Sequence, residues 1–152
     1  AAKCRFFLSS AAGIDALPRL FRRPIMWVNY LPFEYVHVAD SRTVWIPKKH
    51  WLRQEKRFMR FREILDSGAG RFIRKSDFDR LDIELIENTP EEIDAAVIEM
   101  DDRLSGRWQS TREAEDLQRR FWALFKPSDI NGTEFRAHLG AQFLYDHRDL
   151  LD

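Results

Sequence analysis

The stretch that decides the fold runs from Phe6 to Asn29 and reads FFLSSAAGIDALPRLFRRPIMWVN. The apolar residues up to Leu8 predict a short buried strand, and the small residues from Ser9 to Gly13 are typical of a tight turn. Apolar residues at helical spacing then predict a helix over Ile14 to Phe21, and a second buried strand follows over Ile25 to Val28. Strand, turn, helix and strand in this order form a βαβ unit, which implies parallel strands.

The rest of the chain continues the alternation and then becomes helical. Thr89 and Pro90 form a helix start, with a threonine N-cap and a proline at the first helical position. The other predicted elements are a strand over Thr43 to Ile46, a helix over Phe58 to Leu65, an alternating segment over Asp82 to Glu87, and helices over Thr111 to Phe125 and Thr133 to Leu151, the last with a break near Gly140. The sequence predicts an α/β fold, a Rossmann-like parallel sheet with helices on both faces and a C-terminal helical cover.

The size and composition of the chain fit one domain over residues 1–152. Its 152 residues are too few for two well-filled cores, while 44% hydrophobic and 13% aromatic residues can build one. The single cysteine, Cys4, excludes an intrachain disulfide and fits a reducing compartment. The sequence opens directly on a strand, so we expect it to be the C-terminal fragment of a longer protein.

Charge is distributed unequally along the chain, although it sums to zero. Residues 1–62 hold 13 Lys and Arg against 4 Asp and Glu, whereas residues 63–152 hold 12 against 21. The basic excess is greatest between Arg42 and Arg62. Two solvated faces that attract each other would explain this pattern, and so would a local site for a phosphate-bearing metabolite. Zero net charge disfavours nucleic acid as the main partner.

The turn after Leu8 is the most informative candidate for chemistry. At the carboxyl end of a parallel strand, the backbone N–H groups of a helix N-terminus point outward and carry positive potential. Serine hydroxyls at Ser9 and Ser10 could complete a cradle, and Gly13 would let an anion approach the backbone. The turn is therefore a candidate phosphate site, with ordinary helix capping as the alternative.

An ordered set of short motifs resembles a bacterial family of glycosyltransferases of surface-carbohydrate synthesis, and more broadly the C-terminal nucleotide-sugar-binding domain of GT-B enzymes. The set covers nearly the whole chain: FFLSS at 6–10, LFRRP at 20–24, VNY at 28–30, IPKK at 46–49, FREIL at 61–65, NTPEEI at 88–93 and FL at 143–144. The resemblance implies a two-domain enzyme whose nucleoside-diphosphate sugar lies on this domain. The acceptor, and often the catalytic base, would lie on a missing N-terminal domain. The family often has a glycine where this chain has Ser9, and a second serine or an aspartate where this chain has Ala12. We therefore expect fewer side-chain donors to phosphate here.

The candidate site residues follow from these two lines of argument. In the donor site we expect Ser9, Ser10, Ala12, Gly13, Asn29 and Glu63, and the candidate catalytic residue is Lys48. Lys48 follows a strand end and could neutralise charge on the leaving diphosphate. The resemblance implies that Glu63 accepts the ribose hydroxyls. The structural alternatives are a turn residue for Asn29, a surface lysine for Lys48 and a salt bridge with a nearby arginine for Glu63.

Several other residues are expected to have no role in chemistry. Lys49 and His50 are interpreted as solvated surface residues, and Asn88 and Glu92 as helix-capping residues. The aromatic segment over Trp27 to Tyr35 is expected either to stack on a base or sugar or, more in keeping with a fragment, to contact the missing domain. No metal ligand set is apparent, because the histidines lack partners at ligand spacing.

The sequence thus predicts a glycosyltransferase domain that binds a nucleotide sugar as donor substrate, has no permanently bound cofactor, and transfers the sugar to a cell-surface carbohydrate or lipid-linked acceptor. We expect it in the cytoplasm, at the inner face of the membrane through peripheral contact. As an isolated fragment it would bind the donor without turnover. The alternatives are a non-catalytic interaction module and a non-sugar transferase acting on polysaccharide.

Overall fold

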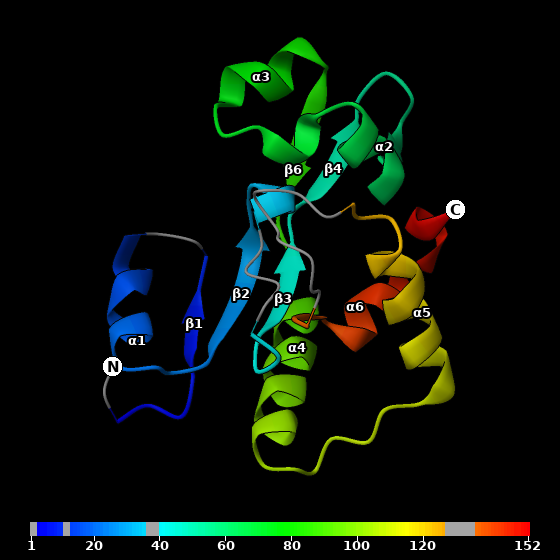
Figure 1. Cartoon of the computed structure of the whole chain (residues 1–152). Coiled ribbons are helices and arrows are strands. Elements are labelled where there is room, and N and C mark those ends of the chain that lie inside the picture. Colours follow the sequence, from blue (N-terminus) through cyan, green and yellow to red (C-terminus); the bar gives the residue numbers. More distant parts are fainter. Residues whose placement is uncertain (1–2, 11–12, 36–39, 127–135) are drawn as a thin grey trace.

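The structure, a computed structural model, describes residues 3–10, 13–35, 40–126 and 136–152 and contains two small sheets (Figure 1). The first is parallel, in the order β1-β2-β3-β7. Its strands are β1 (Phe7–Ser9), β2 (Ile25–Tyr30), β3 (Val44–Pro47) and β7 (His138–Leu139). The α/β class and the parallel sheet are therefore as the sequence predicts.

The second sheet is antiparallel and was not predicted. It consists of β5 (Arg57–Phe58), β4 (Lys49–Leu52) and β6 (Ile83–Ile86), in the order β5-β4-β6. The helix expected from Phe58 begins at Phe61, because residues 57–58 pair with β4. The adjoining helices are α2 (Phe61–Asp66), η3 (Ala69–Arg71) and α3 (Lys75–Arg80).

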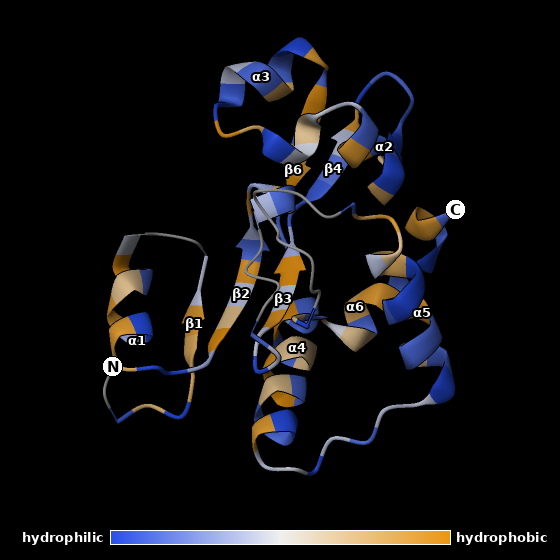
Figure 2. Cartoon of the chain, in the orientation of Figure 1, coloured by the Kyte–Doolittle hydropathy of each residue, from blue (hydrophilic) through white to orange (hydrophobic). Residues whose placement is uncertain are grey.

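Helices lie against both faces of the parallel sheet. Helix α4 (Pro90–Leu104) packs on β2 and β3. Trp45 of β3 contacts Phe121 of α5 (Arg112–Trp122), with ring centroids 5.8 Å apart. Because successive strand residues point to opposite faces of a sheet, one strand can contact helices on both sides. The remaining helices are η1 (Gly13–Asp15), α1 (Ala16–Leu20), η2 (Phe33–Tyr35), α6 (Ala141–Asp146) and η4 (Arg148–Leu151). Figure 2 shows the apolar residues concentrated along β2 and β3 between these helices.

The C-terminal segment is not wholly helical as predicted, and its residues 133–135 lie outside the described part. Strand β7 pairs with β3 in parallel, with His138 opposite Val44. Gly140 then starts α6 at a position where a Cβ atom would lie 2.9 Å from Cγ2 of Ile46. Close packing against β3 therefore requires glycine here, and the break predicted near Gly140 is explained by this contact.

The aromatic segment after β2 forms core rather than an exposed contact surface. Trp27, Tyr30 and Phe33 are all buried, and the ring of Phe33 stacks on Phe61 with centroids 5.7 Å apart. Of the described residues in this segment, Tyr35 is the exposed large one. The expectation that these aromatics face a missing domain or stack on a base is thus wrong for Trp27, Tyr30 and Phe33, because their side chains are already buried within this chain.

Candidate functional site

The carboxyl ends of β1, β2 and β3 share one edge of the parallel sheet, and several predicted site residues lie there. The register pairs Ser9 with Trp27 and Tyr30 with Pro47. Ser9 ends β1, Asn29 lies near the end of β2 and Lys48 follows β3. The strand order therefore brings these three residues to the same edge, where α/β proteins commonly bind ligands.

The turn after β1 is exposed, but one of its two hydroxyls is already engaged. Ser9 is buried, and its hydroxyl donates to the carboxylate of Asp15, which is also buried. Ser10 and Gly13 are exposed, and a Cβ on Gly13 would meet no atom within 4 Å. Ala12 lies outside the described residues. Ser10 and Gly13 are thus accessible to a ligand, whereas the hydroxyl of Ser9 is engaged by Asp15.

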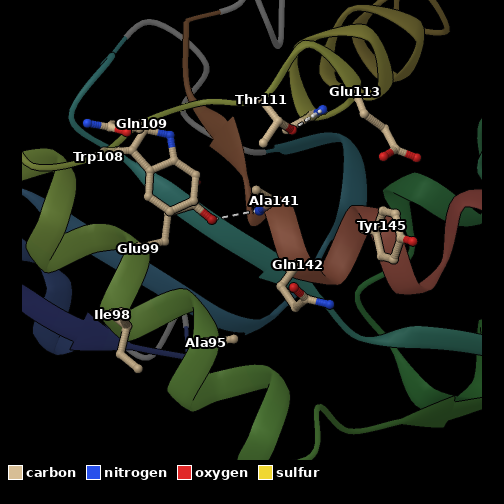
Figure 3. A pocket seen from close by; sticks show the side chains of 11 residues that line it. Ala95, Ile98, Glu99, Trp108, Gln109, Thr111, Glu113, Ala141, Gln142 and Tyr145 are labelled. Atoms are coloured by element: carbon tan, nitrogen blue, oxygen red, sulfur yellow. Dashed lines mark hydrogen bonds between the residues drawn. The ribbon is translucent and has the colours of Figure 1, made fainter.

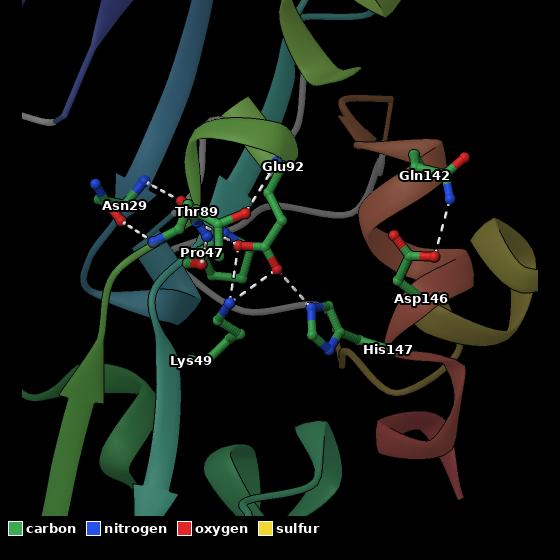
Figure 4. Close-up of polar contacts among 9 residues, drawn as sticks. Asn29, Pro47, Lys49, Thr89, Glu92, Gln142, Asp146 and His147 are labelled. Atoms are coloured by element: carbon green, nitrogen blue, oxygen red, sulfur yellow. Dashed lines mark hydrogen bonds and ion pairs between the residues drawn. The ribbon is translucent and has the colours of Figure 1, made fainter. Parts of the chain in front are cut away.

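Asn29 ties the sheet to the start of α4 (Figure 4). Its backbone N–H donates to Oδ1 of Asn88 at 2.6 Å, and the backbone N–H of Asn88 donates to Oδ1 of Asn29 at 2.6 Å. The Nδ2 of Asn88 donates to the carbonyl of Pro47 at 2.8 Å. Asn29 has a φ of 51°, a left-handed conformation that asparagine tolerates better than most residues. Asn88 therefore bridges strands and does not cap the helix, whereas Thr89 and Glu92 form the predicted capping box.

Lys48 is held loosely at the same edge. Its Nζ lies 3.0 Å from Oε1 of Glu87, whose side chain is 70% exposed. An exposed pair of this kind contributes about 0–1 kcal/mol. The ammonium can therefore exchange Glu87 for an anionic ligand at little cost.

Lys49 lies inside the molecule, contrary to the surface position predicted for it. Its side chain is 6% exposed, and its Nζ lies 2.8 Å from both carboxylate oxygens of Glu92. Glu92 also accepts from Nε2 of His147 at 2.6 Å (Figure 4). Burial raises the pKa of Glu92, but hydrogen bonds from His147 and Lys49 outweigh it and lower that pKa to about 2. This Lys49–Glu92–His147 cluster joins β4, α4 and the C-terminal segment.

His50 is also buried, and its predicted surface position is wrong. Its ring lies between Phe33 and Phe78, with centroids 6.4 and 5.7 Å away. Nδ1 lies 3.2 Å from the carbonyl of Lys48, while Nε2 has no partner among the described residues. Burial lowers the pKa of His50 to about 4, so the ring is neutral at pH 7.

Glu63 lies on α2, beside the antiparallel sheet, and is engaged there. Its two carboxylate oxygens accept from Arg57 at 2.8 Å each, and the backbone N–H of Arg60 donates to it at 2.8 Å. The hydrogen bond from Arg57 lowers the pKa of Glu63 to about 2. The salt bridge that the sequence offered as the alternative is thus present, and ribose binding would require Arg57 to move.

The structure also contains a cavity that the sequence did not indicate, of about 550 Å³, between α4, α5 and α6 (Figure 3). Glu99 lies in its wall, buried and bonded to Arg103 at 2.8 Å and to the N–H of Ala141 at 2.6 Å. Burial raises the pKa of Glu99. Trp108 is half-buried and lines this cavity. Its exposure depends on helix packing, which spacing along the chain does not reveal.

The basic run between Arg42 and Arg62 is largely neutralised by carboxylates, many of them from the acidic part of the chain. Besides the Lys48 and Lys49 pairs, Arg53 lies 3.5 Å from Asp82 and 3.3 Å from Glu84. Arg57 pairs with Glu55 and Glu63. Mutual attraction therefore accounts for most of the charge asymmetry in this run.

Within the described ranges, no group of three or more His, Cys, Asp or Glu side chains is placed to hold a metal ion. Over the same residues, no helix has the length and apolar character needed to cross a membrane. Comparison with known proteins gives no match to any family model, curated protein or solved structure.

Proposed function

We propose that this chain is the nucleotide-sugar-binding domain of a GT-B-type glycosyltransferase, with the donor diphosphate at the carboxyl edge of the parallel sheet. The observation that carries the proposal is the parallel register, since it gathers Ser10, Asn29 and Lys48 at the edge where α/β folds bind ligands. The reason for proposing sugar transfer is the resemblance of the ordered sequence motifs to glycosyltransferases.

In this proposal each residue has a separate task. The hydroxyl of Ser10 and the backbone around Gly13 bind the diphosphate, and Lys48 leaves Glu87 to neutralise the leaving group. Asn29, near the end of β2, positions the loop between β6 and α4 through Asn88. The acceptor, a surface carbohydrate or a lipid-linked one, and the catalytic base belong to a second domain. A cytoplasmic location at the inner face of the membrane suits a nucleotide-sugar donor.

The test is titration of the chain with UDP, GDP and their sugars, followed by two substitutions. Ser10→Ala and Lys48→Ala should each weaken nucleotide binding about tenfold, because each removes a hydrogen bond to a charged group. Ser76→Ala and Lys75→Ala are controls outside the proposed site: Ser76 is exposed like Ser10, and Lys75, like Lys48, forms one ion pair with a carboxylate, that of Asp79. The absence of nucleotide binding, or equal affinity in all four variants, would remove the proposal.

A further variant tests the turn itself. Asp15 is buried next to Ser9 and carries a carboxylate that opposes an incoming phosphate. Asp15→Asn should keep the contact with Ser9 and raise nucleotide affinity several-fold, since it removes that repulsion. An affinity equal to that of the parent chain would place the diphosphate elsewhere.

The interaction module remains a second candidate because of one observation. Large apolar residues are exposed along the first βα unit: Leu8, Ile14, Leu17, Leu20 and Phe21. Such a cluster is typical of a contact surface. Self-association or vesicle binding without any nucleotide binding would favour this candidate over the enzyme.

A further inference from the structure

A second cavity, of about 360 Å³, lies at the opposite, amino-terminal end of β2 and β3. It is surrounded by the segment that leads from α1 into β2 and by the segment that leads into β3. Six of the residues that line it are charged or aromatic: Arg19, Arg22, Arg23, Trp27, Asp40 and Arg42. Four arginines thus line one small cavity whose wall contains a single acidic residue.

Two of these arginines are held in place by the protein. Arg42 uses Nε and Nη2 to contact the carboxylate of Asp40, both at 3.2 Å, and its Nη1 lies 3.4 Å from the carbonyl of Arg22. The guanidinium of Arg19 lies over the ring of Trp27, 5.6 Å from its centroid. These contacts pre-organise the wall of the cavity, which lowers the entropy lost on binding.

For Arg19 and Arg22, the positive charge of the cavity is not balanced by a carboxylate of the described residues. Asp40 is engaged by Arg42, and neither Arg19 nor Arg22 forms an ion pair with a carboxylate in the described part of the chain. This distinguishes them from most cations of the basic run, which have acidic partners. The cavity therefore has a surplus of positive charge and unused planar N–H donors.

The backbone at Arg22 adds an independent observation. Arg22 follows Phe21, the C-cap residue of α1, and has a φ of 51°, the left-handed conformation in which helices usually place glycine. A side chain at this position destabilises the fold relative to glycine, and strain of this kind is typical of functional sites. An arginine is thus present at a position where the backbone conformation alone would favour glycine.

We propose that this arginine cavity, formed by Arg19, Arg22, Arg23 and Arg42, binds a phosphate-bearing ligand. Guanidinium groups present paired N–H donors in a plane that matches two phosphate oxygens, so several of them around one cavity recognise a phosphate or diphosphate. The site is separate from the carboxyl edge and does not depend on the proposed function. Among the described residues, this cavity fits the phosphate site suggested by the charge pattern of the first third, because Arg19 and Arg22 have no carboxylate partner there.

The test measures inorganic phosphate and pyrophosphate binding to the whole chain by NMR and calorimetry. Arg22→Gly should weaken pyrophosphate binding at least about tenfold, because it removes a charge-assisted hydrogen bond. The same variant should keep or raise the thermal midpoint, since glycine suits the left-handed conformation. A loss of binding in this variant therefore cannot be attributed to unfolding.

Lys56→Gly is the matched control. Lys56 is an exposed cation with a φ of 53°, so this change also removes one charge at a left-handed position, but outside the cavity. It should leave pyrophosphate affinity unchanged. An equal loss in both variants, or no loss in Arg22→Gly, would overturn the proposal, since the binding would then be non-specific or elsewhere.

Two further measurements identify the source of the phosphate and test whether the two proposed sites are independent. Leu20, in the same segment, is 76% exposed, so a phosphate on a lipid is one source. Phosphatidylcholine vesicles with phosphatidic acid should then bind the chain better than those without, and Arg22→Gly should abolish the difference. If free pyrophosphate binds and the two vesicle types do not differ, the ligand is soluble.

Nucleotide binding lost in Lys48→Ala but kept in Arg22→Gly would show that the two sites are independent.

Discussion

The cations at the two edges of the parallel sheet differ in whether a carboxylate is paired with them. At the carboxyl edge, Lys48 and Lys49 have the carboxylates of Glu87 and Glu92 within 3.0 Å. At the amino edge, Arg19 and Arg22 line a cavity without an ion-pair partner among the described residues. A basic segment in a sequence therefore does not reveal which cations are available to a ligand, because their partners can lie about 40 residues away along the chain.

The carboxyl edge itself contains two kinds of ion pair. The Lys49–Glu92–His147 cluster is nearly excluded from water, with side chains 6%, 10% and 17% exposed. The Lys48–Glu87 pair is open to solvent on the glutamate side. The first pair is expected to hold the fold together, and the second is free to exchange partners.

The largest effect should come from Glu92→Gln. This change leaves the ammonium of Lys49 buried without a countercharge, and breaking a buried pair in this way destabilises proteins by about 3–5 kcal/mol. Urea denaturation should show a correspondingly lower free energy of unfolding. Glu87→Gln is the control and should change that free energy by about 1 kcal/mol or less. Equal effects of the two changes would remove the distinction between the pairs.

The pH dependence of the same cluster follows from Glu92. Its pKa is about 2 in the folded chain against 4.5 ordinarily, so its contribution to stability is present above pH 4.5 and is lost as the pH falls toward 2. Glu63, with a pKa also lowered to about 2, adds to the same window. In Glu92→Gln, the acid-induced loss of stability should be smaller across this range. An unchanged acid profile would contradict the assignment.

His50 should produce the next effect, in a different pH window. Its pKa is about 4 in the folded chain against 6.5 ordinarily, so the unfolded chain takes up a proton first as the pH falls. Stability present above pH 6.5 should decline between pH 6.5 and 4, by an amount on the order of 3 kcal/mol. His50→Phe, which suits the neighbouring Phe33 and Phe78, should reduce that decline. His138, whose pKa burial also lowers to about 4, should add a further decline in the same window, which remains in His50→Phe.

The sequence predicted the parts of the fold that depend on local signals. Thr89 and Pro90 define the start of α4, and the apolar stretches on either side of the small-residue turn define β1 and β2. Strand β7 was not predicted, since its two residues are too few for any periodicity and its pairing with Val44 spans the chain. Local sequence thus determined elements that form from neighbouring residues.

The sequence predicted where the candidate site residues lie better than it predicted whether their side chains are buried or ion-paired. Topology alone places Ser9, Asn29 and Lys48 at one edge, and the structure confirms that placement. The environments of Lys49, His50 and Glu63 depend on Glu92, Phe33 and Arg57, which meet them only after the two sheets pack. Burial and ion pairing arise from tertiary contacts, so a single sequence without those contacts does not report them.

The smallest effect on the free energy of unfolding is expected at Arg22 and Asn29, two left-handed residues that lie at opposite edges of the sheet. Arg22→Gly should raise the free energy of unfolding by several tenths to about 1 kcal/mol, because glycine adopts this conformation without strain. Asn29→Gly should lower it, even though its φ is the same 51°, because it removes the acceptor of the N–H of Asn88. Opposite signs in thermal denaturation would mean that the left-handed residue at the carboxyl edge serves the fold, while the one at the amino edge is retained at a cost to stability. If Arg22→Gly also destabilises, its side chain is part of the packing, and the strain argument for a ligand at the arginine cavity is lost.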